Sequence, residues 1–319
     1  MNFFVPLHPI MRKIVCIIAT ICLLTSCGQS YEEKQKISRA QRRQLLREDS
    51  AALKVAVMPT MDCLPLFVAA EHGLFKAQGV DVRLKHFTAQ MDCDTAVARG
   101  RVEGLVSDLV RTERLQQQGT PLRYVAATNA YWQLITNRNA RIRELKQLDD
   151  KMVGMTRYSA TDLLTSIAVD SAKLKTERVF RIQINDVNIR LRMLIGNELD
   201  AMLLTEPQAV QARLQKHRVL MDSRSLDLRL GVLAFSEKAL KDTKREQQLT
   251  LFVKAYGQAC DSLARRGVLP YRDVAEKYCH VTGAALDSLA KTVTFETVSA
   301  PRQKDVERAQ MWVGKGVKE

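Results

Sequence analysis

From Leu53 onward, short runs of β-branched and other apolar residues alternate with longer amphipathic stretches. The apolar run Leu53–Met58 is followed by a helical pattern over Leu64–His72 that ends at Gly73, and a second apolar run follows at Val80–Leu84. Strands separated by helices of about 10–15 residues indicate βαβ units, whose strands lie parallel in one sheet. The alternation therefore predicts an α/β fold with mostly parallel sheets flanked by helices.

The alternation starts again at Lys151–Met155, and the two halves share a shorter pattern. Gly100–Asp108 and Asn197–Glu206 each contain a helix end, a turn and an apolar strand with polar residues at its end. Two such lobes predict a ligand site between them. After Gly231–Phe235 the chain is mainly helical, most clearly over Leu249–Leu263. The remaining predicted strands are 105–106, 122–127, 179–184 and 200–204, and the remaining predicted helices are 94–99, 188–195 and one that ends at Lys173.

The first thirty residues have the order of an export signal. Arg12 and Lys13 precede the apolar run Ile14–Leu24, which is too short to span a bilayer as a helix but has the length of a signal-peptide apolar region. The following Leu-Thr-Ser-Cys resembles a bacterial lipobox, in which Cys27 is lipidated and becomes the new N-terminus. Residues 1–26 are therefore predicted to be a signal peptide, with Met11 as an alternative start because the residues before it fit a signal poorly.

The net charge of the chain raises the question of a polyanionic partner. The 319 residues contain 49 Lys and Arg against 35 Asp and Glu, a formal charge of +14, of which +10 lies in residues 51–319. These basic residues are scattered beside acidic ones, as at Lys241–Arg245, which is typical of a solvated surface. Scattered charge and export together argue against nucleic-acid binding. Residues 27–52 are predicted to be a solvated, partly helical tether.

Four cysteines remain after export and lipidation, namely Cys63, Cys93, Cys260 and Cys279. Disulfides persist in an exported protein, and four cysteines allow three pairings. The sequence does not choose among these pairings.

Several motifs are weakly specific one by one, but their order and spacing resemble those of a known family. This is the NMT1/THI5-like family of periplasmic solute-binding proteins of the nitrate, sulfonate and thiamine-precursor type, which feed ABC importers. The resemblance is carried mainly by Pro65–Phe75 and Gly79–Val82 and covers about residues 53–290. Supporting matches lie in residues 96–104, 119–122, 125–126, 145–155, 200–201 and 206–207. Within 145–155, Asp150 replaces a glycine of the family pattern.

The resemblance implies a periplasmic-binding-protein type II fold whose two lobes close over a ligand. Lobe one would comprise residues 53–136 and 230–319, and lobe two residues 137–229. It also implies a monomer without a cofactor or metal, with an ABC permease and ATPase as partners and a lipid anchor in the membrane.

The predicted ligand-binding residues follow strand ends and precede helices. Helix N-termini there present free N–H groups to an anion or a polar oxygen. The candidates in lobe one are Thr60, Met61, Asp62, Gln90, Met91, Asp92, Asp108 and Trp132, and those in lobe two are Tyr158, Ser159, Thr161, Asn185, Asp186 and Glu206. Ser159 or Thr161 either contacts the ligand or only caps its helix.

The charge of these loops bears on the ligand. Arg157 is the only basic residue in them, against the acidic residues Asp62, Asp92, Asp94, Asp108, Asp186 and Glu206. A cleft for nitrate or a sulfonate should concentrate arginine and N–H donors. The acidic loops favour instead a ligand with an amine, a protonated heterocycle or many donors, such as a thiamine-precursor pyrimidine. Aspartates also cap helices, so part of this set is structural.

Met61-Asp62-Cys63 recurs as Met91-Asp92-Cys93. Three interpretations stay open: a soft Cu(I) site, a Cys63–Cys93 disulfide, and two unpaired thiols, the last being favoured.

The sequence contains no Walker loop, no G-x-S-x-G, no G-x-G-x-x-G and no histidine pair with metal spacing. We therefore predict a substrate-binding lipoprotein of an ABC importer rather than an enzyme, exported and anchored to a bacterial membrane facing the periplasm. One alternative is an enzyme of cofactor biosynthesis on the same fold, which the export signal contradicts because such enzymes are cytoplasmic. The other is a lipoprotein that senses its ligand, and the sequence does not separate sensing from transport.

Overall fold

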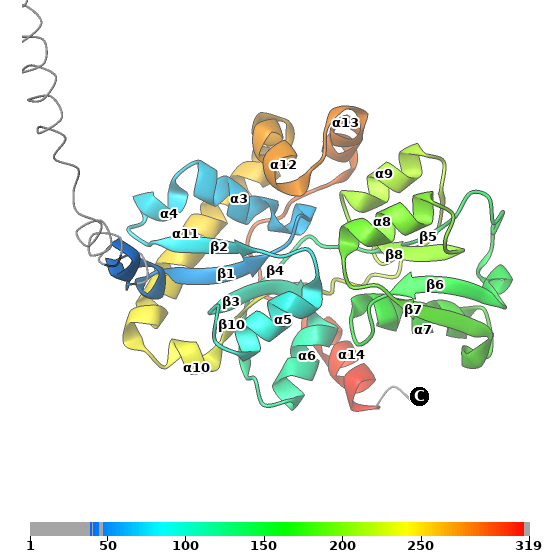
Figure 1. The fold of residues 1–319 in the computed structure, drawn as a ribbon, viewed down its shortest axis with the longest axis horizontal. Helices are drawn as coiled ribbons and strands as arrows, with labels where there is room; N and C mark the ends of the chain where they lie inside the picture. The colour runs from blue at the N-terminus through cyan, green and yellow to red at the C-terminus, as the bar shows by residue number, and fades with distance from the viewer. Residues whose placement is uncertain (1–38, 40, 45–46, 316–319) are drawn as a thin grey trace, which may run out of the picture. The chain divides into compact units, whose positions relative to one another are not determined.

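Two five-stranded sheets form the centre of the protein in a computed structural model (Figure 1). The structure describes residues 39, 41–44 and 47–315. The predicted signal peptide, Cys27 and residues 28–38 of the predicted tether lie outside the described residues. Residues 41–44 and 47–51 are helical. Within the described ranges, no helix combines the length and the hydropathy needed to cross a membrane.

The first sheet has the strand order β2-β1-β3-β10-β4. β1 (Leu53–Val57) pairs in parallel with β2 (Val82–His86) and β3 (Gly104–Asp108). β10 (Gly231–Ser236) runs antiparallel between β3 and β4 (Leu122–Ala127). Every residue of β10 is buried, as expected for an inner strand of a sheet that helices cover.

The second sheet repeats this plan with the order β7-β6-β8-β5-β9. β6 (Lys151–Met155) pairs in parallel with β7 (Val179–Gln183) and β8 (Ala201–Leu204), and β5 (Gln133–Thr136) runs antiparallel between β8 and β9 (Arg218–Asp222). In each sheet the inner antiparallel strand is the one that the chain enters on crossing from the other sheet. Both sheets are therefore mixed, although the alternation of strands and helices alone predicts parallel pairing.

The position of β5 moves the predicted boundary between the lobes. Residues 133–136 were assigned to lobe one, but they lie in the second sheet, so the first crossing is made by residues 128–132. The return crossing is made by residues 223–230, between β9 and β10. The sequence analysis missed β5 and β9 because β5 has only four residues and β9 has no clear alternation of buried and exposed positions.

Helices cover the sheets, with α3 and α4 above the first sheet and α5 and α6 below it in the view of Figure 1. Those of the first lobe are α3 (Leu64–Glu71), α4 (Leu74–Ala77), α5 (Gln90–Ala98), α6 (Leu109–Gln117), α10 (Glu237–Leu240), α11 (Thr243–Arg266) and α12 (Arg272–Cys279). Those of the second lobe are α7 (Ala160–Ser171), α8 (Val187–Ile195) and α9 (Gln208–Leu214). Near the end of the chain, α13 (Gly283–Thr292) packs against α9, and α14 (Gln303–Gly314) packs against α6. Short 3₁₀ turns occur at 61–63, 145–148, 176–178 and 269–271.

The last helix, α14, connects the two lobes by apolar packing. It lies beside α6, and its Val306 and Ala309 share one hydrophobic cluster with Leu109 of α6 and Leu164 of α7. Burial of apolar side chains from both lobes in one cluster stabilises their association.

Three helices that follow parallel strands, α6, α7 and α8, each have a polar N-cap. Asp108 caps α6, Ser159 caps α7 and Asp186 caps α8 through hydrogen bonds to backbone N–H groups of the first turn. These caps place polar side chains and helix N-termini at the edges where the sheets approach each other.

The close contact between β3 and β10 makes Gly104 essential for packing. A Cβ atom at Gly104 would lie 2.7 Å from ring carbons of Phe235, which is fully buried. Gly104→Ala is therefore expected to lower the free energy of unfolding by roughly 1–3 kcal/mol in urea denaturation, because the ring has to move in a packed core.

Gly257→Ala is the matched control. Gly257 lies within α11, and the nearest atom to its added Cβ is a Val298 methyl at 3.8 Å. Alanine is expected to leave the stability unchanged or to raise it by roughly 0.5–1 kcal/mol. Equal destabilisation by both substitutions would contradict the packing explanation.

Candidate functional site

A small polar cavity lies between the two sheets, at the ends of their parallel strands. Its volume is about 50 Å³. Seven predicted ligand-binding residues line it, namely Thr60, Asp62, Gln90, Asp108, Trp132, Ser159 and Thr161. The other lining residues are Met58, Cys63, Val106, Ser107, Arg111, Ala130, Thr156, Val187, Arg190 and Thr205. The lining comes from both lobes, as the sequence pattern predicts for a site between them.

The other seven predicted residues are placed outside the lining of this cavity. Met61 is buried, whereas Met91 and Asp92 are exposed. Tyr158 lies under the guanidinium of Arg114, with 3.4 Å between the guanidinium carbon and the ring centre. The rest are Asn185, which accepts a hydrogen bond from Gln183, Asp186, which caps α8, and Glu206.

Glu206 is fully engaged within the protein. Its Oε1 accepts hydrogen bonds from the Tyr131 hydroxyl at 2.8 Å and pairs with Arg213 at 2.7 Å, and its Oε2 accepts from the Val210 N–H at 2.8 Å. Tyr131 belongs to the first crossing segment, so this carboxylate fixes the crossing to the start of α9. In this structure its oxygens face protein donors rather than the cavity.

The acidic side of the cavity includes Asp62, which is 9% exposed. Burial raises the pKa of Asp62, and hydrogen bonds from the Thr60 and Thr128 hydroxyls oppose that rise. Among the described residues, no Lys or Arg forms an ion pair with this carboxylate. A cationic or donor group of a ligand would therefore find an available acceptor here.

Two arginines from helices also line the cavity, so its charge is not given by the loop residues alone. Arg111 is buried and paired with Asp94, with Nε 2.6 Å from the carboxylate. Arg190 is 5% exposed and donates to the Leu203 carbonyl at 3.1 Å, while its Nε–H has no partner in the part of the chain that the structure describes. Burial lowers the pKa of Arg190 to about 10.

The sequence analysis missed both arginines because they lie one turn inside helices rather than in loops. Arg111 follows the N-cap of α6 by three residues, and Arg190 follows the N-cap of α8 by four. The helix period places both side chains on the same face as their caps. This spacing is the signal that could have found them.

Asp108 joins the two lobes across the cavity. Its Oδ1 accepts a hydrogen bond from Arg111 N–H at 3.0 Å, in its own helix, and one from Ala160 N–H at 2.9 Å, in the first turn of α7. Burial raises the pKa of Asp108 to about 6, with the neighbouring Arg111 opposing the rise.

Further hydrogen bonds close the lobes around the cavity. Met61 N–H donates to the Glu206 carbonyl at 2.9 Å, Val187 N–H donates to the Thr88 carbonyl at 3.1 Å, and the Gln208 amide donates to the Pro59 carbonyl at 3.3 Å. A cavity of about 50 Å³ holds only a few water molecules. The two lobes are thus in direct contact around this cavity.

All four described cysteines are free and buried, so no disulfide joins Cys63 to Cys93. Cys63 Sγ accepts a weak hydrogen bond from Thr60 at 3.6 Å, and burial raises the pKa of its thiol. No group of three or more His, Cys, Asp or Glu residues with metal-site geometry occurs in the described ranges.

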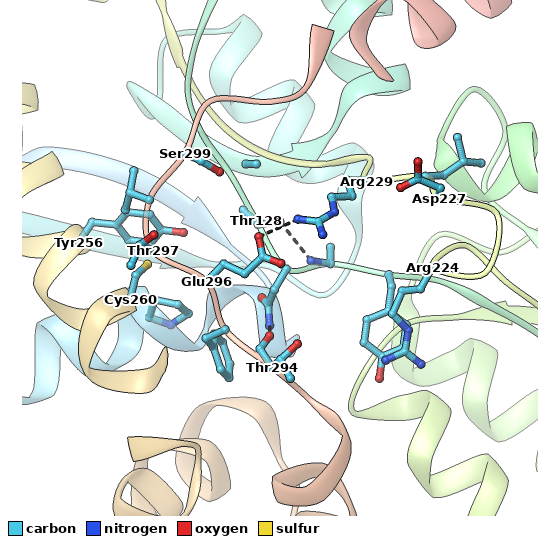
Figure 2. A pocket seen from close by; sticks show the side chains of 18 residues that line it. Thr128, Arg224, Asp227, Arg229, Tyr256, Cys260, Thr294, Glu296, Thr297 and Ser299 are labelled. Atoms are coloured by element: carbon cyan, nitrogen blue, oxygen red, sulfur yellow. Dashed lines mark hydrogen bonds and ion pairs between the residues drawn. The ribbon is translucent and has the colours of Figure 1, made fainter. Parts of the chain in front are cut away.

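A larger cavity of about 240 Å³ lies behind the crossings (Figure 2). Segments 127–131, 224, 227–229 and 294–299 line it, together with Pro65, Tyr256 and Cys260. Its charged groups are satisfied locally: Arg229 pairs with Glu296 at 2.6 Å, and Asp227 pairs with Arg302 at 2.6 Å. In the smaller cavity, Asp62 has no ion-pair partner and the Arg190 Nε–H has no partner among the described residues, so we take this cavity as the candidate for ligand binding.

The architecture of two mixed sheets with a cavity between them is that of the periplasmic binding proteins. A family model described as NMT1/THI5 like matches residues 60–265, well over half of the chain. The chain therefore belongs to the NMT1/THI5-like family. No curated protein matches it.

Solved structures with a similar fold include the alkanesulfonate-binding protein of Xanthomonas axonopodis pv. citri bound to MOPS, with 16% identity, a TM-score of 0.71, and coverage of 83% of this chain and 91% of that one. The periplasmic aliphatic sulphonate-binding protein of Escherichia coli has 16% identity, a TM-score of 0.70, and coverage of 84% and 94%. The periplasmic nitrate-binding protein of Synechocystis PCC 6803 has 12% identity, a TM-score of 0.66, and coverage of 79% and 74%. At these identities the likeness shows the fold.

The raised pKa of Asp108 predicts a pH-dependent stability. The folded protein binds this proton more tightly than the unfolded chain, so the stabilisation is complete below the ordinary value of 3.8 and is lost as the pH rises through about 6. Between pH 4 and pH 7, the free energy of unfolding of the native chain should therefore fall relative to that of Asp108→Asn by roughly 1–3 kcal/mol. Parallel urea titrations of the two proteins measure this difference, and identical pH profiles would contradict it.

Proposed function

We propose that this protein is the substrate-binding lipoprotein of an ABC importer, which captures a small polar solute between its lobes and delivers it to a membrane permease. Membership of the NMT1/THI5-like family and the two-lobed fold support the importer role. The observation that carries the choice of ligand is Asp62, a buried carboxylate in the interlobe cavity without a cationic partner among the described residues. The lipobox at Cys27 supports anchoring to a membrane, facing the periplasm.

The ligand is proposed to carry an amine or another donor group that meets Asp62. An uncompensated carboxylate in a buried site is costly, and a ligand cation or a pair of N–H donors offsets that cost. On the other side of the cavity, the free Nε–H of Arg190 calls for an acceptor atom. An aminopyrimidine has both kinds of group, and Trp132 in the same lining offers a flat apolar surface for its ring.

Several features support binding rather than catalysis. The cavity lining contains no histidine, and its one thiol, that of Cys63, has a raised pKa and is therefore protonated at neutral pH. The described lining thus offers neither a Ser–His nor a Cys–His pair. The energy for transport is proposed to come from the permease and ATPase partners.

Closure is proposed to be the step that the ligand controls. The hydrogen bond from Ala160 N–H to Asp108 joins the lobes beside the cavity, and separation of the lobes would break it and widen the entrance for a ligand. A bound ligand then stabilises the closed state by its greater affinity for that state than for the open one.

A thermal-shift screen of the mature domain tests the ligand class. The panel contains alkylamines, aminopyrimidines, alkanesulfonates and nitrate. We expect a concentration-dependent rise in Tm with an amine or an aminopyrimidine. Asp62→Asn should weaken the affinity for the same compound by roughly 10- to 100-fold in calorimetry, because a charge-assisted hydrogen bond is replaced by a neutral one.

Asp92→Asn is the matched control. Asp92 belongs to the same predicted set but lies on the exposed face of α5, outside the cavity lining. We expect it to bind like the native chain. A shift with sulfonates or nitrate only, or equal affinities for the native chain and Asp62→Asn, would overturn the assignment of an amine-binding cleft.

A further inference from the structure

The Asp108 carboxylate occupies a junction that the backbone has arranged for an anion. Helices α6 and α7 belong to opposite lobes, and their first turns both direct N–H groups at one oxygen of this side chain. Helix N-termini bind anions because their first N–H groups lack partners within the helix and carry the positive end of the helix dipole. Two such ends therefore converge on a single carboxylate that belongs to the chain itself.

A second observation is that Arg190 adds a buried hydrogen-bond donor to the lining of the cavity at this junction. Arg190 lines the same cavity, is 5% exposed and keeps a buried Nε–H without a partner in the described residues. The guanidinium of Arg111 also lines it, although Asp94 already pairs with that group. A buried, incompletely partnered arginine beside two helix ends is the donor set of an oxyanion site.

Asp108 thus fills the place where an oxyanion would bind. A second anion at this point would meet a buried carboxylate, and both N–H groups that it needs already donate to Asp108. The cavity therefore offers a ligand a hydrogen-bond donor at Arg190 and a hydrogen-bond acceptor at Asp62.

We propose that Asp108 is the specificity-determining residue of the cleft: it is an internal anion that holds the α6–α7 junction and so excludes small oxyanions such as nitrate and alkanesulfonates. The inference rests on the proposed function in that it takes this cavity as the substrate site. In this proposal, the side chain of Asp108 alone causes the cleft to select an uncharged or cationic ligand.

The test is a gain of binding. Asp108→Ala removes the carboxylate and frees the N–H groups of Arg111 and Ala160, so that a small oxyanion can replace it. In calorimetry at pH 8 and constant ionic strength, the affinity for sodium nitrate, methanesulfonate and formate should rise roughly 10- to 100-fold over the native chain. The same anions should raise the Tm of Asp108→Ala and leave the native Tm unchanged.

Two control variants show what a gain of anion binding requires. One removes the charge of Asp108 but keeps an oxygen at the junction, and the other removes a different helix-capping carboxylate. Asp108→Asn is neutral but keeps an oxygen at the junction, so it should not gain affinity for these anions. Asp186→Ala removes a carboxylate that also accepts two helix N–H bonds, from Asn188 and Ile189 of α8 alone, and it should gain none either. A gain by Asp108→Asn equal to that of Asp108→Ala would overturn the proposal.

The remaining outcomes distinguish this inference from the function on which it rests. Tight nitrate or methanesulfonate binding by the native chain would overturn the role of Asp108 and leave a role in import standing. A gain by Asp108→Ala in a protein whose native form binds no solute of the panel would support the internal anion and count against the proposed function. If Asp108→Ala is poorly folded, Asp108→Ser is measured in the same way, and a folded variant without a gain overturns the proposal.

Discussion

Burying the ends of two sheets against each other requires nearly every polar group there to find a partner inside the protein. Asp108 meets this requirement by accepting N–H groups from both lobes, and Asp94 meets it by pairing with Arg111. Glu206 does so with a hydroxyl, a guanidinium and a backbone N–H. Among the described residues, the Arg190 Nε–H and single oxygens of Asp94 and Gln208 remain buried without a partner, and Asp62 has no ion-pair partner. Asp62 and Arg190 line the cavity that is proposed as the ligand site.

The two crossings connect this cavity to the one behind it. Ala130 lines both cavities, and Tyr131 lines the larger one while its hydroxyl bonds to Glu206 at the start of α9. Because residues of both crossings line the cavity shown in Figure 2, a rotation of the lobes about these crossings would also reshape that cavity. α14 adds resistance to such a movement, since its apolar face packs in a cluster that includes both α6 and α7.

The position of Thr60, Asp62 and Asp108 at the interlobe cavity was predictable because they follow strand ends, and the ends of parallel strands meet at one edge of an α/β sheet. Arg111 and Arg190 were missed because a sequence shows which helix face a side chain occupies but not which face meets the other lobe. Asp186 and Glu206 also follow strand ends, as Asp108 does. Asp186, however, caps only its own helix, and Glu206 is held by Tyr131 and Arg213. Their difference from Asp108 arises from long-range contacts that no local pattern contains.

The sequence by itself determined the elements: alternating apolar runs and amphipathic stretches produce strands and helices from local periodicity, and the N-caps fix where the helices begin. It also determined that the strand ends carry carboxylates. Only the tertiary structure decided the mixed pairing of the sheets, because β5 and β10 enter their sheets from a crossing of the chain. It alone decided that Asp108 bonds to Ala160, 52 residues away in the other lobe, while Asp62 stays without a cation. The physical reason is that burial sets the cost of each charge, and burial exists only once the lobes have met.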